Sequence, residues 1–191
     1  REQMSGYTGG LLESEVFGET EINEIEKALK SLKLNPENLE EYRKNGYLDY
    51  VNSIRFTKLV QKKYPDDEEV GPSNPKERFA NDIHATLMEE LGIEDSEEVL
   101  FYSSVKTPLD LKHGVDAFFE IKKKEGDSFL ITMDVSMKDK EFQKANVLVI
   151  MKDGAPDPSE KDYEENLKDI ANALKSVFDS GDRFKKVKVF V

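Results

Sequence analysis

The 191-residue sequence contains no cysteine and only two histidines. Without cysteine the chain can form no disulfide, no thiolate zinc site and no cysteine nucleophile. Two histidines give little support to a zinc site built on histidine ligands. No apolar run approaches the roughly 20 residues that cross a bilayer. The sequence therefore predicts a cytoplasmic protein without a membrane segment.

Positive charge is also scarce, because 28 lysines and arginines stand against 40 acidic residues and give a net charge of -12. This balance argues against a protein that grips nucleic acid through a global positive field. It does not exclude a nuclease with a bound divalent cation, because carboxylate ligands add negative charge. The glycine-rich phosphate-binding motifs and the G-x-S-x-G nucleophile motif are absent as well.

The patterning divides the chain into four regions. Residues 1–18 are glycine-rich and weakly periodic, which predicts a flexible tail. Residues 19–64 show apolar residues at helical spacing, which predicts a small helical region. Residues 65–75 contain three prolines and four consecutive acids and form the best candidate linker. Residues 76–191 remain as a larger domain.

The larger domain alternates helical and strand patterns. Its predicted elements are a helix with Pro75 at its first position and Gly92 after its end, three strands, a short polar piece, a fourth strand, a long helix and a last strand. This order predicts an α/β fold with a mixed central sheet flanked by helices, preceded by an N-terminal helical layer. The predicted bounds are 75–91, 98–103, 115–122, 128–135, 146–151, 159–178 and 186–191.

Two aspartates are predicted to face each other in this sheet. If the hairpin between the second and third strands is centred on Glu125, Asp116 lies opposite Asp134. Opposed residues share one face of the sheet, with β-carbons about 4.5–5.5 Å apart. Two such carboxylates repel unless a cation lies between them, and Mg²⁺ prefers this kind of ligand. A slip of one residue would instead separate them, and Asp134 would then be an ordinary solvated residue.

The same residues carry a resemblance to a known family. The run TPLDLKHGVDAFFEI, followed by FLITMDVSMK, resembles the core of the restriction-endonuclease-like (PD-(D/E)XK) nuclease superfamily over residues 76–151. The resemblance implies that Asp116 and Asp134 bind Mg²⁺ or Mn²⁺. It implies a further acid from the preceding helix, Glu89 or Glu90. The implied activity is hydrolysis of phosphodiester bonds in nucleic acid.

The sequence departs from the family pattern at one position. Ser136 stands where the acid–x–Lys triplet has its lysine. Lys138, Lys140 and Lys144 are the candidates to replace it. We favour Lys138, because it lies on the same face of the strand as Ser136 if the strand continues. We also favour Lys144, because the polar piece that follows could bring it back to the site. Without such a lysine, the alternative is a catalytically inactive nuclease-fold protein that acts as an interaction or assembly component. A weaker alternative is an acidic surface for a basic partner.

Other residues have a structural and a functional interpretation. The spacing Asp110-x-x-His113-x-x-Asp116 fits a metal cluster, but a single loop histidine is more typical of a capping residue. Lys185, Lys186 and Lys188 either contact phosphate or protect an edge strand. No surface of interleaved basic and aromatic residues is visible in the sequence, and Phe118, Phe119 and Phe129 are predicted core. Nucleic acid and a protein partner both stay open, and the oligomeric state is not determined.

Overall fold

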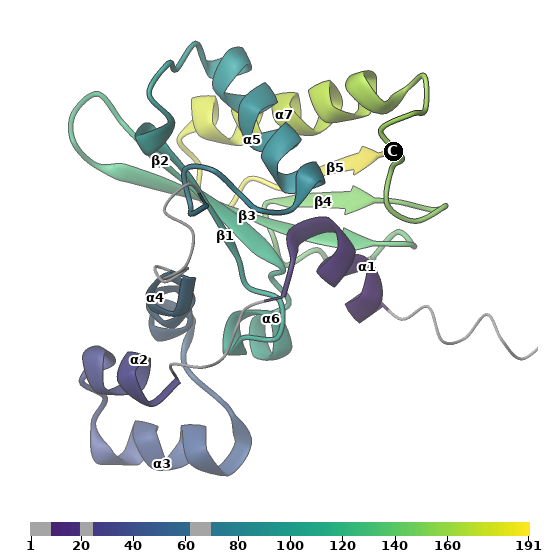
Figure 1. Cartoon of the computed structure of the whole chain (residues 1–191). Coiled ribbons are helices and arrows are strands. Elements are labelled where there is room, and N and C mark those ends of the chain that lie inside the picture. Colours follow the sequence, from purple (N-terminus) through teal and green to yellow (C-terminus); the bar gives the residue numbers. More distant parts are fainter. Residues whose placement is uncertain (1–8, 20–24, 62–69) are drawn as a thin grey trace, which may run out of the picture.

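The computed structural model describes residues 9–19, 25–61 and 70–191 (Figure 1). Parts of the predicted tail, helical region and linker (1–8, 20–24 and 62–69) lie outside the described residues. Thirteen elements are described within these ranges, and five of them are strands of one sheet. None of the described helices is long and apolar enough to cross a membrane.

The predicted tail is wrong for residues 9–17, which form helix α1 (Gly9–Phe17). Leu12 and Val16 on this helix have no exposed surface, and Phe17 packs against Phe101 of the sheet with ring centroids 5.7 Å apart. The glycines at its start weaken the helical pattern in the sequence. Burial against the rest of the core holds the helix in place despite its weak intrinsic preference.

The predicted helical region is confirmed for its described residues by three helices, α2 (Ile25–Leu32), α3 (Pro36–Asn45) and α4 (Tyr50–Gln61). Their boundaries follow local chemistry. The Asn35 side chain accepts a hydrogen bond from the Asn38 amide at 2.8 Å, Pro36 occupies the first turn, and Gly46 ends α3 with a φ of 73°. The helices share a small apolar core of Ala28, Leu29, Leu32, Leu48, Phe56 and Val60.

The mixed central sheet is also confirmed. Its strands stand in chain order: β1 (Val99–Ser103), β2 (Ala117–Lys122), β3 (Ser128–Ser136), β4 (Val147–Ile150) and β5 (Val187–Phe190). The first three pair antiparallel, and β4 and β5 add in parallel. The predicted hairpin register is right, because Phe118 pairs with Thr132 and Glu120 with Leu130.

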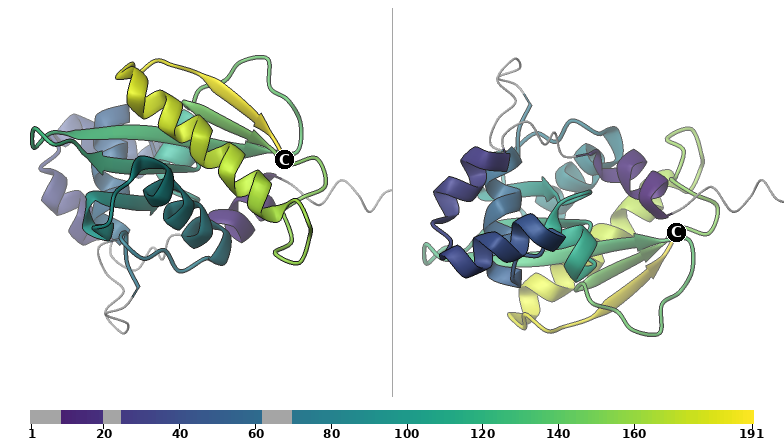
Figure 2. Two further views of the ribbon diagram at one scale, coloured as in Figure 1. Left: turned by 90° about the horizontal axis from the view of Figure 1, so that it is seen from above. Right: turned by 90° about the horizontal axis from the view of Figure 1, so that it is seen from below.

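Helices α5 (Arg78–Leu91) and α7 (Tyr163–Ser180) cover one face of the sheet (Figures 1 and 2). They lie over the main apolar core, to which the inward residues of β2 and β3 contribute. A 3₁₀ turn (Ser96–Glu98) joins α5 to β1. The predicted start at Pro75 is wrong: α5 begins at Arg78, after Glu77 in an extended conformation and a turn in which Gly71 and Asn74 pair.

The opposite face is covered by α4, by the short helix α6 (Pro108–His113) and by residues 137–146, here called the β3–β4 loop. The sequence did not predict α6, although Pro108 at its start and Gly114 after its end are typical helix boundaries. The β3–β4 loop, which the sequence predicts as a short polar piece, contains no helix. Asp116 and Asp134 lie on this side of the sheet, with Phe118 and Glu120.

Candidate metal centre

Asp116 lies one residue before β2, at the end of its ladder with β3. Its amide donates to the Met133 carbonyl at 2.9 Å, and its Oδ2 accepts a hydrogen bond from the Val135 amide at 2.8 Å. The side chain therefore reaches across to β3 beside Asp134. Both carboxyl groups are buried, with 2% of Asp116 and 4% of Asp134 exposed. The structure thus brings together the two aspartates that the sequence paired.

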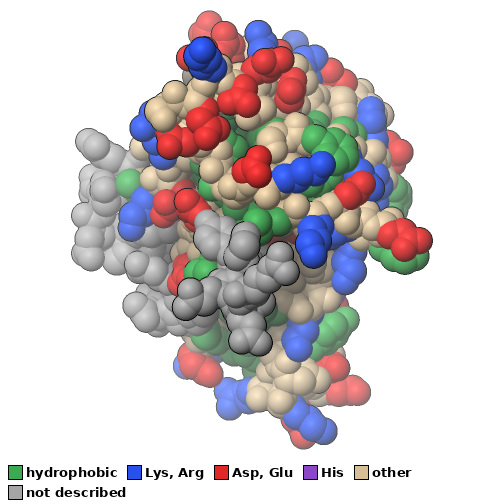
Figure 3. All heavy atoms as spheres, turned by 90° about the vertical axis from the view of Figure 1, so that its right-hand side faces the viewer, with side chains coloured by type: hydrophobic (Ala, Val, Ile, Leu, Met, Phe, Trp, Pro, Cys, Tyr) green, Lys and Arg blue, Asp and Glu red, His purple; other side chains and the backbone are tan. Residues whose placement is uncertain are grey.

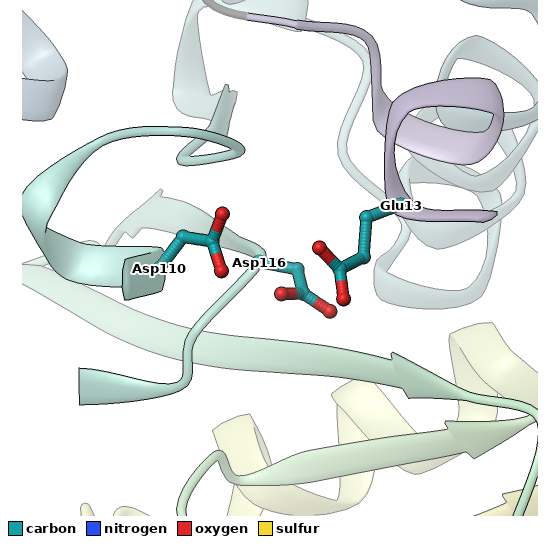
Figure 4. Close-up of side chains that lie close together, drawn as sticks. All are labelled: Glu13, Asp110 and Asp116. Carbon is teal, nitrogen blue, oxygen red and sulfur yellow. The ribbon is translucent and has the colours of Figure 1, made fainter. Parts of the chain in front are cut away.

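Two further acids converge on Asp116 from separate elements. Asp110 comes from α6 and Glu13 from α1, and Figure 4 shows the three carboxylates directed at one another. One oxygen from each residue lies within 4.8 Å of the other two. Three carboxylate oxygens at this spacing match the ligands that a hard divalent cation takes, with water completing its shell. Segments nearly 100 residues apart in sequence therefore build one acidic site.

Burial of these acids raises their pKa values. Burial, together with the charge of Asp134 and a hydrogen bond to it, raises the pKa of Asp116 to about 10. Burial and the charges of Asp110 and Asp134 raise the pKa of Glu13 to about 7. Burial likewise raises the pKa of Asp110. A bound cation would reverse each of these shifts, so the chemistry of the donor set fits a divalent metal.

Lys140 supplies the positive charge at this site. Its Nζ lies 2.6 Å from Asp134 Oδ2, and the ion pair joins the β3–β4 loop to the buried strand. In the described part of the chain, one ammonium, that of Lys140, forms an ion pair within this acidic site, which holds the four carboxyl groups of Glu13, Asp110, Asp116 and Asp134. The site therefore has more carboxyl groups than positive charges, and the two positive charges of Mg²⁺ or Mn²⁺ would reduce this excess.

Within the described residues, no ion pair joins either of the two lysines favoured from the sequence to these acids. Lys138 is exposed. Lys144 packs over Gly114. If position 114 carried a β-carbon, that atom would lie 3.1 Å from Cδ of Lys144. Gly114 has a φ of 65°, so both its backbone and this contact favour glycine there. Lys140, from the β3–β4 loop, makes the contact with Asp134 that was expected of Lys138 or Lys144.

Glu89 and Glu90 do not join the acidic site. They lie on α5, across the sheet, and line a surface hollow between α5 and α7. Glu90 there faces Lys168 of α7 at 3.9 Å. The proposed ligand role for Glu89 is therefore replaced by one for Glu13. His113 is also directed away, since its Nε2 lies 2.7 Å from the Leu48 carbonyl oxygen.

Sequence reasoning missed Glu13 and gave Asp110 only a passing role. Glu13 stands in a segment whose periodicity is too weak to predict a helix. The role of Asp110 could have been predicted from the sequence. Pro108 and Gly114 are typical of the two ends of a short helix, and this helix carries Asp110 six residues before Asp116. Comparisons with protein family models, curated proteins and solved structures find no match to this chain.

Proposed function

We propose that this chain is a metal-dependent nuclease, which hydrolyses phosphodiester bonds in nucleic acid with Mg²⁺ or Mn²⁺. The convergence of Glu13 and Asp110 on the Asp116–Asp134 pair, with the Lys140 ammonium beside it, is the observation that carries the proposal. The order of the two aspartates, one just before β2 and one on β3, supports it further, because it follows the restriction-endonuclease-like pattern described above.

Each residue has a role that follows from its position. Glu13, Asp110 and Asp116 would hold the cation, with Asp134 beside them. Once bound, the cation would polarise the scissile phosphate and lower the pKa of a water molecule. Asp134 positions the Lys140 ammonium, which would stabilise negative charge as it develops on the phosphate. Lys140 would thereby take the part that a lysine at position 136 takes in the family.

One observation favours a second candidate, a catalytically inactive scaffold that acts as an interaction or assembly component. The Lys140–Asp134 ion pair neutralises one carboxylate without any metal, and Ser136 replaces the family lysine. In that case Lys140 would be a counter-ion that stabilises the fold. The two candidates differ in whether the site takes up a divalent cation.

The proposal is tested by incubating the full chain with labelled DNA and RNA in Mg²⁺ or Mn²⁺ and comparing Asp116→Asn and Asp134→Asn with the unchanged chain. We expect either substitution to lower the cleavage rate more than about 100-fold, since loss of an outer-shell partner alone costs 10–100-fold. Glu40→Gln, an exposed acid on α3, is the matched control and should cleave normally. Cleavage that survives both aspartate substitutions would refute these roles.

Calorimetry with Mn²⁺ separates the two candidates. A nuclease centre should bind Mn²⁺ and lose the binding in Asp116→Asn. Lys140→Met should then abolish cleavage while Mn²⁺ still binds, with Lys30→Met on α2 as the charge-matched control. Absence of Mn²⁺ binding together with absence of cleavage would select the inactive scaffold.

A further inference from the structure

Three phenylalanines are unusually exposed where the sheet ends at β5. Phe142 is 82% exposed, Phe184 is 83% and Phe190 is 57%. Exposed aromatic side chains that gather at one place mark binding surfaces more often than single exposed apolar residues do. None of the three belongs to the metal centre or to the sheet core, so their exposure calls for a separate explanation.

Hydrogen bonds join the segments that carry two of these residues, Phe142 and Phe184. The Gln143 side chain donates from Nε2 to the Val187 carbonyl at 2.9 Å, and the Asn146 side chain donates from Nδ2 to the Arg183 carbonyl at 2.8 Å. The β3–β4 loop, which carries Phe142, is therefore tied to the segment that carries Phe184 and leads into β5. Phe190 stands at the far end of β5, on the sheet face that this loop covers.

The same two segments hold a concentration of positive charge. Residues 137–146 and 183–190 contain seven lysines and arginines and two acids, a net charge of +5 in a chain of net charge -12. On the side of the molecule drawn in Figure 3, basic, acidic and apolar side chains all reach the surface. A basic and aromatic surface that the sequence did not reveal is thus assembled by two segments about 40 residues apart.

Protection of an edge strand accounts for only part of this surface. Lysines on an edge strand discourage pairing with other chains. Here Lys188 turns onto the β3–β4 loop, where its Nζ lies 2.6 Å from Asp139 Oδ1, and the Lys186 ammonium donates to the Lys144 carbonyl. Protection by charge also gives no reason for three phenylalanines to face solvent. A ligand with both negative charge and flat apolar surfaces explains the two features together.

The β3–β4 loop joins this surface to the metal centre. Asp134, Leu148 and Lys188 are neighbours in one row across β3, β4 and β5. At a strand spacing of about 4.8 Å, Lys188 lies about 10 Å from Asp134. The β3–β4 loop also links both places, because Lys140 reaches Asp134 from the same loop that carries Phe142. The two places are therefore close enough for one extended polymer to reach both.

We propose that Phe142, Phe184 and Phe190, together with Arg183, Lys186 and Lys188, form a binding surface for single-stranded nucleic acid, here called the β5 edge patch. Unpaired bases stack on the phenyl rings, and phosphates lie near the basic groups. A duplex keeps its base faces stacked and offers only its phosphates. The choice of nucleic acid as the ligand rests on the proposed nuclease function, and the inference adds to it a preference for single strands.

The test is a fluorescence anisotropy titration of the full chain with labelled 20-nucleotide oligothymidylate, oligouridylate and a 20-base-pair duplex, in EDTA so that no cleavage occurs. We expect both single strands to bind more tightly than the duplex, with affinity falling as salt is raised. Phe142→Leu and Phe184→Leu should each weaken binding at least about fivefold, because a base–aromatic stack is lost while apolar surface remains. Phe142→Tyr should bind like the unchanged chain. So should Val51→Ala, because Val51 on α4 is also an exposed apolar residue, at 65%.

Three results would overturn the inference: no binding of single strands, equal binding of duplex, or leucine variants that bind normally. A dimer in analytical ultracentrifugation that becomes monomeric in both leucine variants would also overturn it, since the patch would then pair two copies of the chain. Binding that meets the expectation while Mg²⁺ and Mn²⁺ give no cleavage would refute the nuclease proposal and leave the β5 edge patch standing.

Discussion

At the scale of single residues, Asp116 has the most consequential environment in the described part of the chain. It is almost fully buried, beside Asp134 and within reach of Glu13 and Asp110. Its neutral form is favoured by burial, by Asp134 and by Glu13, which raise its pKa to about 10. Ionisation of this buried acid is unfavourable in the absence of a cation. A bound cation would make it favourable, so metal binding and loss of the Asp116 proton are coupled.

This arrangement predicts how stability depends on pH. An aspartate in an unfolded chain has a pKa near 3.9, so between about pH 4 and pH 10 the folded chain holds a proton that the unfolded chain has lost. The contribution of Asp116 to the free energy of unfolding is therefore full at acid pH and falls as the pH rises through this range. Asp116→Asn removes the dependence, and at pH 8 in EDTA we expect it to gain about 0.5–2 kcal/mol, or about 1–8 °C in melting temperature.

Thermal unfolding followed by circular dichroism at pH 5 and pH 8 measures this effect. The gain should be smaller at pH 5, and Mn²⁺ at pH 8 should raise the melting temperature of the unchanged chain but not that of Asp116→Asn. Glu40→Gln again serves as control. An Asp116→Asn variant that is less stable than the unchanged chain at pH 8 would show that Asp116 is not under charge repulsion.

At the scale of elements, α1 connects packing to the site. Its buried side chains Leu12 and Val16 anchor the helix in the main core, while Glu13 between them points toward Asp116. The Glu13 carboxylate is thus positioned by a helix of nine residues that has little stability of its own. Loosening its apolar contacts should disturb the metal centre without touching any acid.

Leu12→Ala tests this coupling. Leu12 has no exposed surface, so the cavity left behind should lower the free energy of unfolding by about 2–5 kcal/mol, measured in urea. The adjacent Leu11 is 53% exposed, and Leu11→Ala should change stability by no more than about 0.5 kcal/mol. Mn²⁺ affinity should fall in Leu12→Ala alone. Equal effects of the two substitutions would mean that α1 is not anchored as described.

At the scale of the whole molecule, the helical layer of α2, α3 and α4 is attached to the sheet by polar contacts. Lys58 of α4 lies 2.5 Å from Glu120 of β2, and both side chains are largely buried. The Gln61 side chain bonds the Ser103 backbone, accepting from its amide at 2.9 Å and donating to its carbonyl. The same layer packs on the sheet face that carries the metal centre, and His113 ties α6 to the Leu48 carbonyl.

A double-mutant cycle on Lys58 and Glu120 measures the strength of this attachment. Lys58→Met leaves a buried carboxylate without its partner and should cost about 1–3 kcal/mol in the free energy of unfolding. Glu120→Gln in the same chain should restore most of that loss, because no buried charge then remains unpaired. Additive effects in urea unfolding would show that the two side chains do not interact in solution.

The sequence determined the parts of this protein that depend on local pattern. Apolar periodicity located the helices of the N-terminal layer, α5, α7 and all five strands within a few residues, because each buries one face of regular geometry. The glycine turn at residues 122–128 fixed the register of β2 and β3, and with it the meeting of Asp116 and Asp134. Alternation along a strand leaves little freedom once the turn is placed.

Only the tertiary structure decided which other groups join that pair. Glu13, Asp110 and Lys140 come from a weakly periodic helix, a six-residue helix and an irregular loop, and such segments are placed by what they pack against and not by their own periodicity. The exposure of Phe142 and Phe184 beside the β5 lysines arises in the same way, from hydrogen bonds that join distant segments. Strand pairing follows from neighbours in sequence, whereas the composition of a site follows from neighbours in space.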